Sequence, residues 1–226
     1  MGNNITERQV RDKIYLRQPI KTKIFTPNDD IIEIVLKYTE GKRKQGDTIV
    51  MSESPVAITQ GRAIPENEVK IGLLAKLLWR GVSKVPYGVG LRSKTSMQCA
   101  IDECGHVRIL LAAIAGAFGK LFGLHGVFYR VAGKQAALID AAHTSPVPPY
   151  NSTVIKGPIH TDEICQKIYE LIGNEAAIMD INDIGGSWVI GRSAGVDPYL
   201  LEEIMRDNPQ GQQMELTPLC LVWEKK

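Results

Sequence analysis

The chain has 226 residues, enough to bury a sizeable core as one large domain or as two lobes. Its 27 lysines and arginines nearly balance its 25 aspartates and glutamates, and a formal charge of +2 argues against a nucleic-acid partner. The most apolar segment, residues 109–124, contains glycines and Lys120 and is shorter than the roughly 20 apolar residues that cross a bilayer, which predicts a buried helix and no membrane partner.

Residues 1–20 are predicted to form an N-terminal extension, followed by the main domain over residues 21–226. The extension carries charged residues early and lacks the apolar run of a secretory signal. The four cysteines show no Cys-x-x-Cys spacing and lie in apolar contexts, as reduced core thiols do; they are Cys99, Cys104, Cys165 and Cys220. These features predict a cytoplasmic protein.

The first third of the main domain alternates helical and extended patterns. A helix should begin near Pro27, because Asp29 and Asp30 offer capping oxygens and negative charge to its free amides. Gly41 should end it. Further along, the apolar patterns predict strands at residues 48–51 and 56–59 and a helix at residues 66–80.

The central part of the main domain predicts a long helix and a hairpin. Residues 95–123 are helical in composition and should break near Gly105. Residues 127–131 and 136–139 predict two strands joined at Gly133. The proline-rich stretch that follows predicts a surface connection, and a lobe boundary near residues 143–153.

The last part of the main domain again mixes helices and strands. Helices are predicted at residues 161–172 and from Asp197 onwards, and strands at residues 176–181, 188–190 and 218–223. Hairpin and crossover spacings occur together, which favours an α+β fold with mixed sheets and packed helices. The glycine-rich signatures of the Rossmann and Walker nucleotide folds are absent from the sequence.

Acidic and amide side chains gather in residues 180–186, where a predicted strand runs into a glycine turn. Strand alternation puts Asp180 beside Asn182, and Asp183 falls at the turn. Hard divalent cations bind clustered oxygen ligands of this kind. The alternative is an Asx turn, in which these side chains cap the backbone of a tight bend.

Two other segments carry candidate ligands. Asp102 and Glu103 lie among apolar residues, where a buried carboxylate needs a partner such as a metal; the alternative is a solvated helix surface near Arg108. Gln212 and Glu215 lie in a polar loop before the last strand, a pattern that means little alone.

The order of these segments resembles the coenzyme F420-0:γ-glutamyl ligase-like family, over about residues 22–223. The similar pieces are residues 28–31, 46–50, 58–62, 100–102, 157–158, 180–186 and 211–218. The resemblance implies a γ-glutamyl ligase-like fold of two intimate lobes. It also implies a homodimer with the site near the subunit contact, to which the apolar residues 110–122 could contribute.

The resemblance also implies site residues. By it, Asp102 binds a divalent metal, the turn with Asn182 and Asp183 supplies further metal ligands, and Gln212 and Glu215 add polar ligands. We add Asp180 to this predicted metal set because of its position beside Asn182. Nucleotide and substrate contacts are predicted for Ser52, Ser54, Gln60, Arg62, Lys156 and Arg192, of which the arginines suit bidentate phosphate binding.

The implied activity is a ligase that adds L-glutamate to a carboxylate-bearing acceptor. GTP or ATP would phosphorylate the acceptor to an acyl phosphate, and Mg²⁺ or Mn²⁺ would neutralise the charges that meet in that step. A deazaflavin coenzyme precursor and a folate-like pterin both remain possible acceptors. Residues 52–55 depart from the serine-lysine pairs of the deazaflavin enzyme, so the alternative is a non-catalytic relative that binds a metabolite.

Overall fold

The computed structural model describes residues 5–82 and 90–225, which divide into two compact units. Unit 1 comprises residues 1–61 and 158–226, and unit 2, residues 62–157, is inserted between these two stretches. Lys156 N donates to Arg62 O at 3.0 Å, so the chain enters and leaves unit 2 at adjacent points. The predicted boundary segment, residues 143–153, lies inside unit 2.

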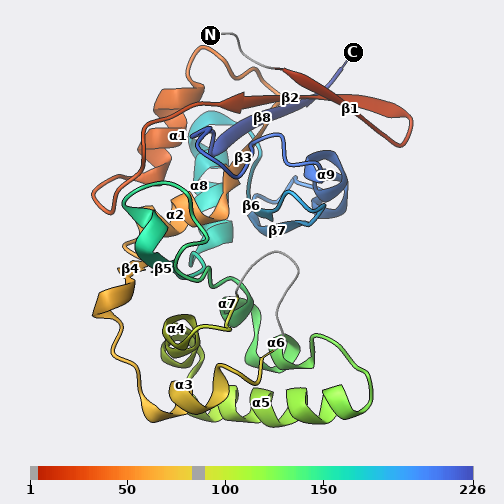
Figure 1. Cartoon of the computed structure of the whole chain (residues 1–226). Helices are drawn as coiled ribbons and strands as arrows, with labels where there is room; N and C mark the ends of the chain where they lie inside the picture. The colour runs from red at the N-terminus through yellow and green to blue at the C-terminus, as the bar shows by residue number, and fades with distance from the viewer. Residues whose placement is uncertain (1–4, 83–89, 226) are drawn as a thin grey trace. The chain divides into compact units, whose positions relative to one another are not determined.

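Unit 1 is a mixed sheet with helices on both faces (Figure 1). Its strands are β1 (Thr6–Val10), β2 (Lys13–Ile20), β3 (Thr48–Ser52), β6 (Ala176–Ile181), β7 (Ser187–Arg192) and β8 (Leu219–Glu224). Its helices are α1 (Ile31–Thr39), α2 (Glu53–Thr59), α8 (Thr161–Ile172) and α9 (Pro198–Met205).

The six strands are ordered β1-β2-β8-β3-β6-β7. Only β3 and β6 are parallel, and the other neighbours pair antiparallel. The residues predicted as an extension thus supply β1 and β2, which are hydrogen-bonded to the rest of the sheet through β8. The predicted α+β class with mixed pairing is confirmed.

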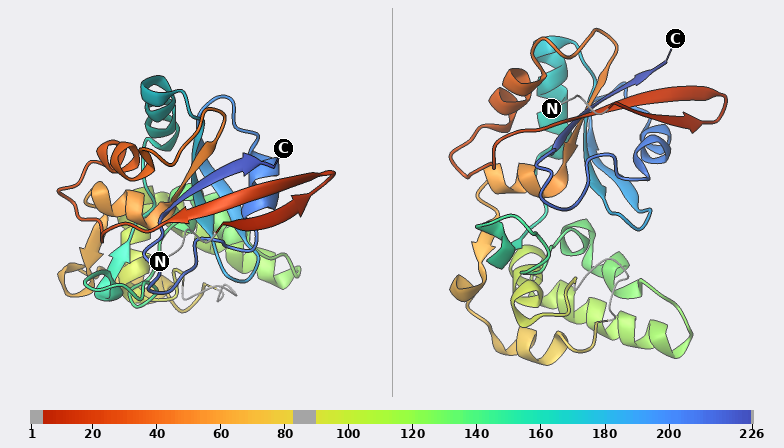
Figure 2. Two further views of the ribbon diagram at one scale, coloured as in Figure 1. Left: turned by 90° about the horizontal axis from the view of Figure 1, so that it is seen from above. Right: turned by 45° about the horizontal axis from the view of Figure 1, so that its top comes forward.

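The core of unit 1 follows strand alternation. Val50, Ala177 and Met179 pack with Leu201 and Met205 of α9 on one face. The intervening residues, among them Ile49, Met51 and Ile178, are also fully buried, on the face that α8 covers. Figure 2 shows α1 and α8 side by side on that same face.

Unit 2 is mostly helical. Its elements are β4 (Ala63–Pro65), the 3₁₀ turns η1 (Glu66–Glu68) and η2 (Tyr150–Ser152), α3 (Leu73–Leu78), α4 (Lys94–Cys104), α5 (His106–Leu121), α6 (Val127–Ala132), α7 (Lys134–Ala137) and β5 (Thr153–Ile155). The predicted break at Gly105 is confirmed, because that residue ends α4 with φ +84 and begins α5. β4 and β5 pair antiparallel.

The predicted hairpin at residues 127–139 is wrong, because both stretches are helical. α6 packs closely on α5, where glycines leave room for it. A Cβ at Gly119 would lie 2.6 Å from Val127 Cγ2, and one at Gly116 would lie 3.1 Å from Phe128 Cβ. Packing of a helix against these two glycines thus overrides the β propensity of the apolar run.

Two shorter predictions also need correction. Residues 56–59 belong to α2, where Pro55 in the first helical turn is tolerated and Val56, Ala57 and Ile58 are buried. The predicted helix at residues 66–80 is instead two separate elements, η1 and α3. Gly72 interrupts it, because this residue has an extended backbone and is the N-cap of α3. Burial in the first case and a glycine in the second outweigh the apolar pattern.

The predicted buried helix at residues 109–124 is buried on one side only. Ile109, Ala112 and Gly119 of α5 face inward. The exposed apolar side chains, which we call the α5 face, are Val107, Leu110, Leu111, Ile114, Phe118, Leu121 and Phe122. Across residues 5–82 and 90–225, no single helix has the length and apolarity to cross a membrane, whereas α4 and α5 together, bent by 118°, satisfy that test by length and composition.

All four cysteines are free thiols, as predicted. Burial raises the pKa of Cys99 to about 11 and the pKa of Cys165 and of Cys220 to about 12. These side chains therefore stay protonated at neutral pH and act as small apolar core residues.

Candidate functional site

The predicted turn of unit 1 joins β6 to β7. Asn182 N donates to Gly186 O at 2.9 Å, which closes the turn. The Oδ1 atom of Asn182 accepts from Ile184 N at 3.2 Å and from Gly186 N at 2.9 Å. Its carboxamide oxygen thus caps the backbone as in an Asx turn, which was the alternative considered for this segment.

Asp183 and Gln212, both predicted as metal ligands, lie side by side at this turn. Gln212 Oε1 accepts from Asp183 N at 3.2 Å, and Gln212 Nε2 donates to Ile181 O at 2.9 Å. Asn208 Nδ2 donates to Asp183 Oδ1 at 2.6 Å. The Asp183 side chain is exposed, and its second carboxylate oxygen has no hydrogen bond to any other described residue.

The remaining predicted residues of unit 1 lie in several local environments. Glu215 folds back over its own loop, where its Oε2 atom accepts from Gln213 N at 2.7 Å. Asp180 pairs across the sheet with Trp188. Gln60 uses both ends of its amide on the backbone of Ile159, at 2.8 and 3.0 Å.

Ser52, Ser54 and Arg192 complete the predicted set in this unit. Ser52 is the N-cap of α2 without a capping side-chain bond, and Ser54 follows it in the first helical turn. Arg192 N donates to Asp162 Oδ1 at 2.8 Å, and its guanidinium donates to Val196 O. Arg192 therefore ties β7 to the segment before α9.

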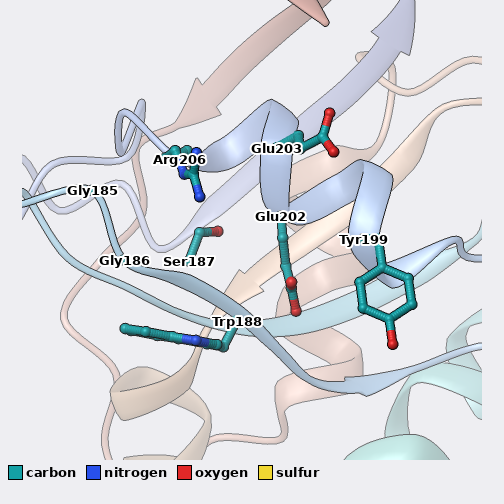
Figure 3. A pocket seen from close by; sticks show the side chains of 8 residues that line it. All are labelled: Gly185, Gly186, Ser187, Trp188, Tyr199, Glu202, Glu203 and Arg206. Atoms are coloured by element: carbon teal, nitrogen blue, oxygen red, sulfur yellow. The ribbon is translucent and has the colours of Figure 1, made fainter. Parts of the chain in front are cut away.

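A pocket of about 250 Å³ adjoins the turn (Figure 3). β7 and the turn before it contribute Gly185, Gly186, Ser187 and Trp188, and α9 with its C-cap contributes Tyr199, Glu202, Glu203 and Arg206. The four α9 residues recur at helical spacing, so they share one helix face. The sequence analysis did not predict this pocket. The four polar residues at helical spacing after Asp197-Pro198 could have indicated it.

Asp102 lies on α4 of unit 2 and is exposed. Its Oδ1 atom accepts from Gln98 Nε2 at 2.8 Å, one helical turn earlier, and Gln98 Oε1 accepts from Gly72 N at 2.9 Å. Its other carboxylate oxygen has no hydrogen bond within the described parts of the chain. α4 thus presents Asp102 as an exposed carboxylate held in one orientation.

Glu103 binds two of the predicted phosphate-binding side chains. Arg62 Nη2 lies 2.5 Å from Glu103 Oε2, and Lys156 Nζ lies 2.9 Å from Glu103 Oε1. All three side chains are at most 16% exposed. Burial alone would raise the pKa of Glu103, but the hydrogen bonds and charges of Lys156 and Arg62 outweigh burial and lower it.

Arg62 and Lys156 are the residues through which the chain enters and leaves unit 2, so Glu103 holds both crossings against α4. We expect Glu103→Gln to destabilise unit 2 by about 3 kcal/mol, because it leaves two mostly buried cations without their carboxylate. Urea unfolding measures this loss. The pKa of Glu103 is lower in the folded protein than its ordinary value of 4.5. The difference in unfolding free energy between the parent protein and Glu103→Gln should therefore be largest above pH 4.5 and should shrink as the pH falls below it.

Glu68→Gln is the matched control, since Glu68 is exposed on the same unit and makes no described ion pair. An equal loss of stability in both variants would contradict the role assigned to Glu103.

The predicted metal set is distributed over both units, with Asp102 in unit 2 and the other members in unit 1. No group of three or more His, Cys, Asp or Glu side chains in residues 5–82 and 90–225 is arranged to hold a metal ion. Asp102 and Asp183 nevertheless suit a hard cation chemically, because each exposes a carboxylate oxygen without a hydrogen bond among the described residues. The Asn182 and Gln212 amide oxygens already accept backbone bonds.

Residues 19–186 match the sequence model of one protein family, which covers most of the chain and defines a class of amide-forming ligases. The chain belongs to this family, described as F420-0:Gamma-glutamyl ligase. The family predicted from the sequence is confirmed, and membership supports a γ-glutamyl ligase of coenzyme F420 biosynthesis. A search of the curated proteins finds no match.

Proposed function

We propose that this protein joins L-glutamate to the carboxylate of a small acceptor, with GTP or ATP as the phosphoryl donor. The family match over residues 19–186 carries the proposal. A carboxylate resists attack by an amine because oxide is a poor leaving group. Transfer of the terminal phosphoryl group to the acceptor carboxylate gives an acyl phosphate, from which the amine of glutamate displaces inorganic phosphate with loss of a proton.

Asp102 in unit 2 and Asp183 in unit 1 are each proposed to bind a divalent cation, Mg²⁺ or Mn²⁺. Both carboxylates are exposed and each is oriented by one amide donor, Gln98 for the first and Asn208 for the second. A bound cation would supply neutralisation of the nucleotide and acceptor phosphates. Gln212 has a positioning role in this proposal, because it fixes the backbone on both sides of Asn182.

Arg62 and Lys156 remain candidates for phosphate binding, although both side chains form ion pairs with Glu103. Their two positive charges face one carboxylate, that of Glu103, so the cluster retains a net charge of +1. Such a cluster can attract an anion without leaving a buried cation unpaired beforehand.

We also propose a homodimer in which the α5 face packs against a second copy of the chain. Six exposed apolar side chains of α5, together with Phe122 at its C-cap, form a patch of the kind that marks interaction surfaces. The unit 2 sequence carries 12 lysines and arginines against 5 acids, whereas the unit 1 sequence carries 15 against 20. Charge complementarity therefore favours the acidic unit 1 of the second copy as the surface that covers α5.

The ligase proposal is tested by incubating the protein with Mn²⁺, GTP or ATP, L-glutamate and a small-molecule extract. Mass spectrometry should find a metabolite heavier by one glutamyl residue, together with stoichiometric GDP or ADP. The identity of that metabolite distinguishes a deazaflavin precursor from a folate-like acceptor. Absence of nucleotide cleavage with every acceptor would instead support the non-catalytic, metabolite-binding alternative.

A further inference from the structure

The family match assigns no role to the pocket between β7 and α9. Six of its eight lining residues, Ser187 to Arg206, follow the end of the matched range at residue 186. Its volume of about 250 Å³ is slightly below the roughly 300–1,000 Å³ of pockets that hold drug-sized ligands. The pocket therefore suits a small metabolite.

Arg206 provides an available cation at this pocket. On a helix, Arg206 would ordinarily pair with Glu202 or Glu203, which precede it by four and three residues. Both glutamates are bound elsewhere: Glu202 Oε1 accepts from Val189 N at 2.9 Å, and Glu203 lies 3.5 Å from Arg11. The guanidinium of Arg206 consequently has no hydrogen bond or ion pair with any residue in the described ranges.

Glu202 provides the opposite charge. Its carboxylate lines the pocket, and only its Oε1 atom is engaged in a described hydrogen bond, to the backbone of β7. Figure 3 shows Glu202 and Arg206 on the same side of α9 with Ser187 between Arg206 and Trp188. The pocket thus presents a carboxylate held by β7 and a guanidinium without a partner among the described residues, two opposite charges that do not neutralise each other.

The Ser187 hydroxyl is a second, independent sign of a ligand. Ser187 is only 8% exposed, and its Oγ atom has no hydrogen-bond partner among the described residues. A buried hydroxyl without a partner is costly, and a polar group bound in the pocket would satisfy it.

Aromatic side chains form the remaining walls. Trp188 packs on Gly186, where a Cβ would overlap both its ring and the Asn182 side chain. The indole is therefore held against the same turn that carries Asp183. Tyr199 stands on α9 at the other end of the pocket (Figure 3). These rings offer apolar surface to the aliphatic stem of a ligand whose charged groups bind Arg206 and Glu202.

We propose that this pocket binds an α-amino acid, with its α-carboxylate on Arg206 and its ammonium group on Glu202. These two opposite charges match the α-carboxylate and ammonium groups of an amino acid, whereas a plain anion would face the uncompensated carboxylate of Glu202. If the proposed ligase function holds, the amino acid is L-glutamate, the one that the reaction consumes. The pocket then supplies the amine nucleophile next to the turn of Asp183.

Isothermal titration calorimetry with L-glutamate tests this site, first with protein alone and then with Mn²⁺ and GTP present. We expect Arg206→Gln and Glu202→Gln each to weaken binding by about 10-fold or more, because each removes a charge-assisted hydrogen bond. Lys167→Gln, which removes an exposed cation from α8, should leave the affinity unchanged. Glutarate, which lacks the amine, should bind less tightly than L-glutamate and should gain affinity in Glu202→Gln, because that change removes the negative charge facing it.

Undiminished L-glutamate binding in both pocket variants, or no binding to the parent protein under either condition, would overturn this site. The first result would place the amino acid elsewhere and leave the ligase proposal intact, since turnover is measured separately. Conversely, pocket-dependent binding in a protein without ligase activity would retain the site and reject the proposed reaction.

Discussion

Asp183→Asn is expected to abolish metal-dependent turnover while the protein stays folded. Asparagine keeps the size and the turn preference of aspartate, and its oxygen can still accept the Asn208 bond. What it removes is the negative charge that a divalent cation needs from its ligand. Because a bound metal supplies several kcal/mol of charge stabilisation, we expect kcat/KM to fall roughly 100-fold or more.

The measurement is steady-state release of GDP or ADP over a series of Mn²⁺ concentrations, with circular dichroism as the check of folding. Asp12→Asn is the matched control, because Asp12 is an exposed aspartate in the turn between β1 and β2. If excess Mn²⁺ restores turnover in Asp183→Asn, Asp183 acts through metal affinity. Turnover equal to that of the parent protein would remove Asp183 from the site.

Phe118→Glu is expected to convert a dimer into a monomer. Phe118 is 60% exposed near the centre of the α5 face, so a charge there costs the single subunit little. In the proposed dimer the same glutamate would lose its hydration and face the acidic unit 1 of the second copy, at a cost of several kcal/mol. Light scattering coupled to gel filtration should therefore give half the mass of the parent protein.

Phe118→Leu keeps the apolar character and should remain dimeric. A dimer that survives Phe118→Glu would contradict the α5 face as the contact. A parent protein that is monomeric and sediments with anionic lipid vesicles would assign this face to a membrane surface instead, which the basic residues of unit 2 would also suit.

Secondary structure was predictable wherever local signals agreed with packing. The predicted bounds of α8 and β6 are those of the structure, because a polar helix start and a continuous apolar run each allow one interpretation. The predicted hairpin at residues 127–139 is wrong because Val127 and Phe128 pack on two glycines of α5, a tertiary contact that no local pattern contains.

The predicted site residues stay a prediction, although the structure brings two of them together. Asp183 and Gln212 are 29 positions apart in the sequence, and the Asp183 backbone N–H donates to Gln212 Oε1. The engagement of Arg62 and Lys156 by Glu103 was missed, because Arg108 is nearer in sequence. Arg206 was not predicted as a ligand-binding residue. Its guanidinium has no ion pair among the described residues because Glu202 binds Val189 N and Glu203 lies near Arg11, and these are tertiary contacts that the local sequence does not contain.

The position of β8 constrains how the protein can be built during translation. This strand comes last in the sequence but is inserted between β2 and β3, where it pairs with both. Before residues 219–224 are synthesised, the β1-β2 hairpin has no strand that pairs it with β3, β6 and β7. In the nascent chain the edges of β2 and β3 that will pair with β8 are therefore unpaired, and chaperone binding to such edges protects against aggregation.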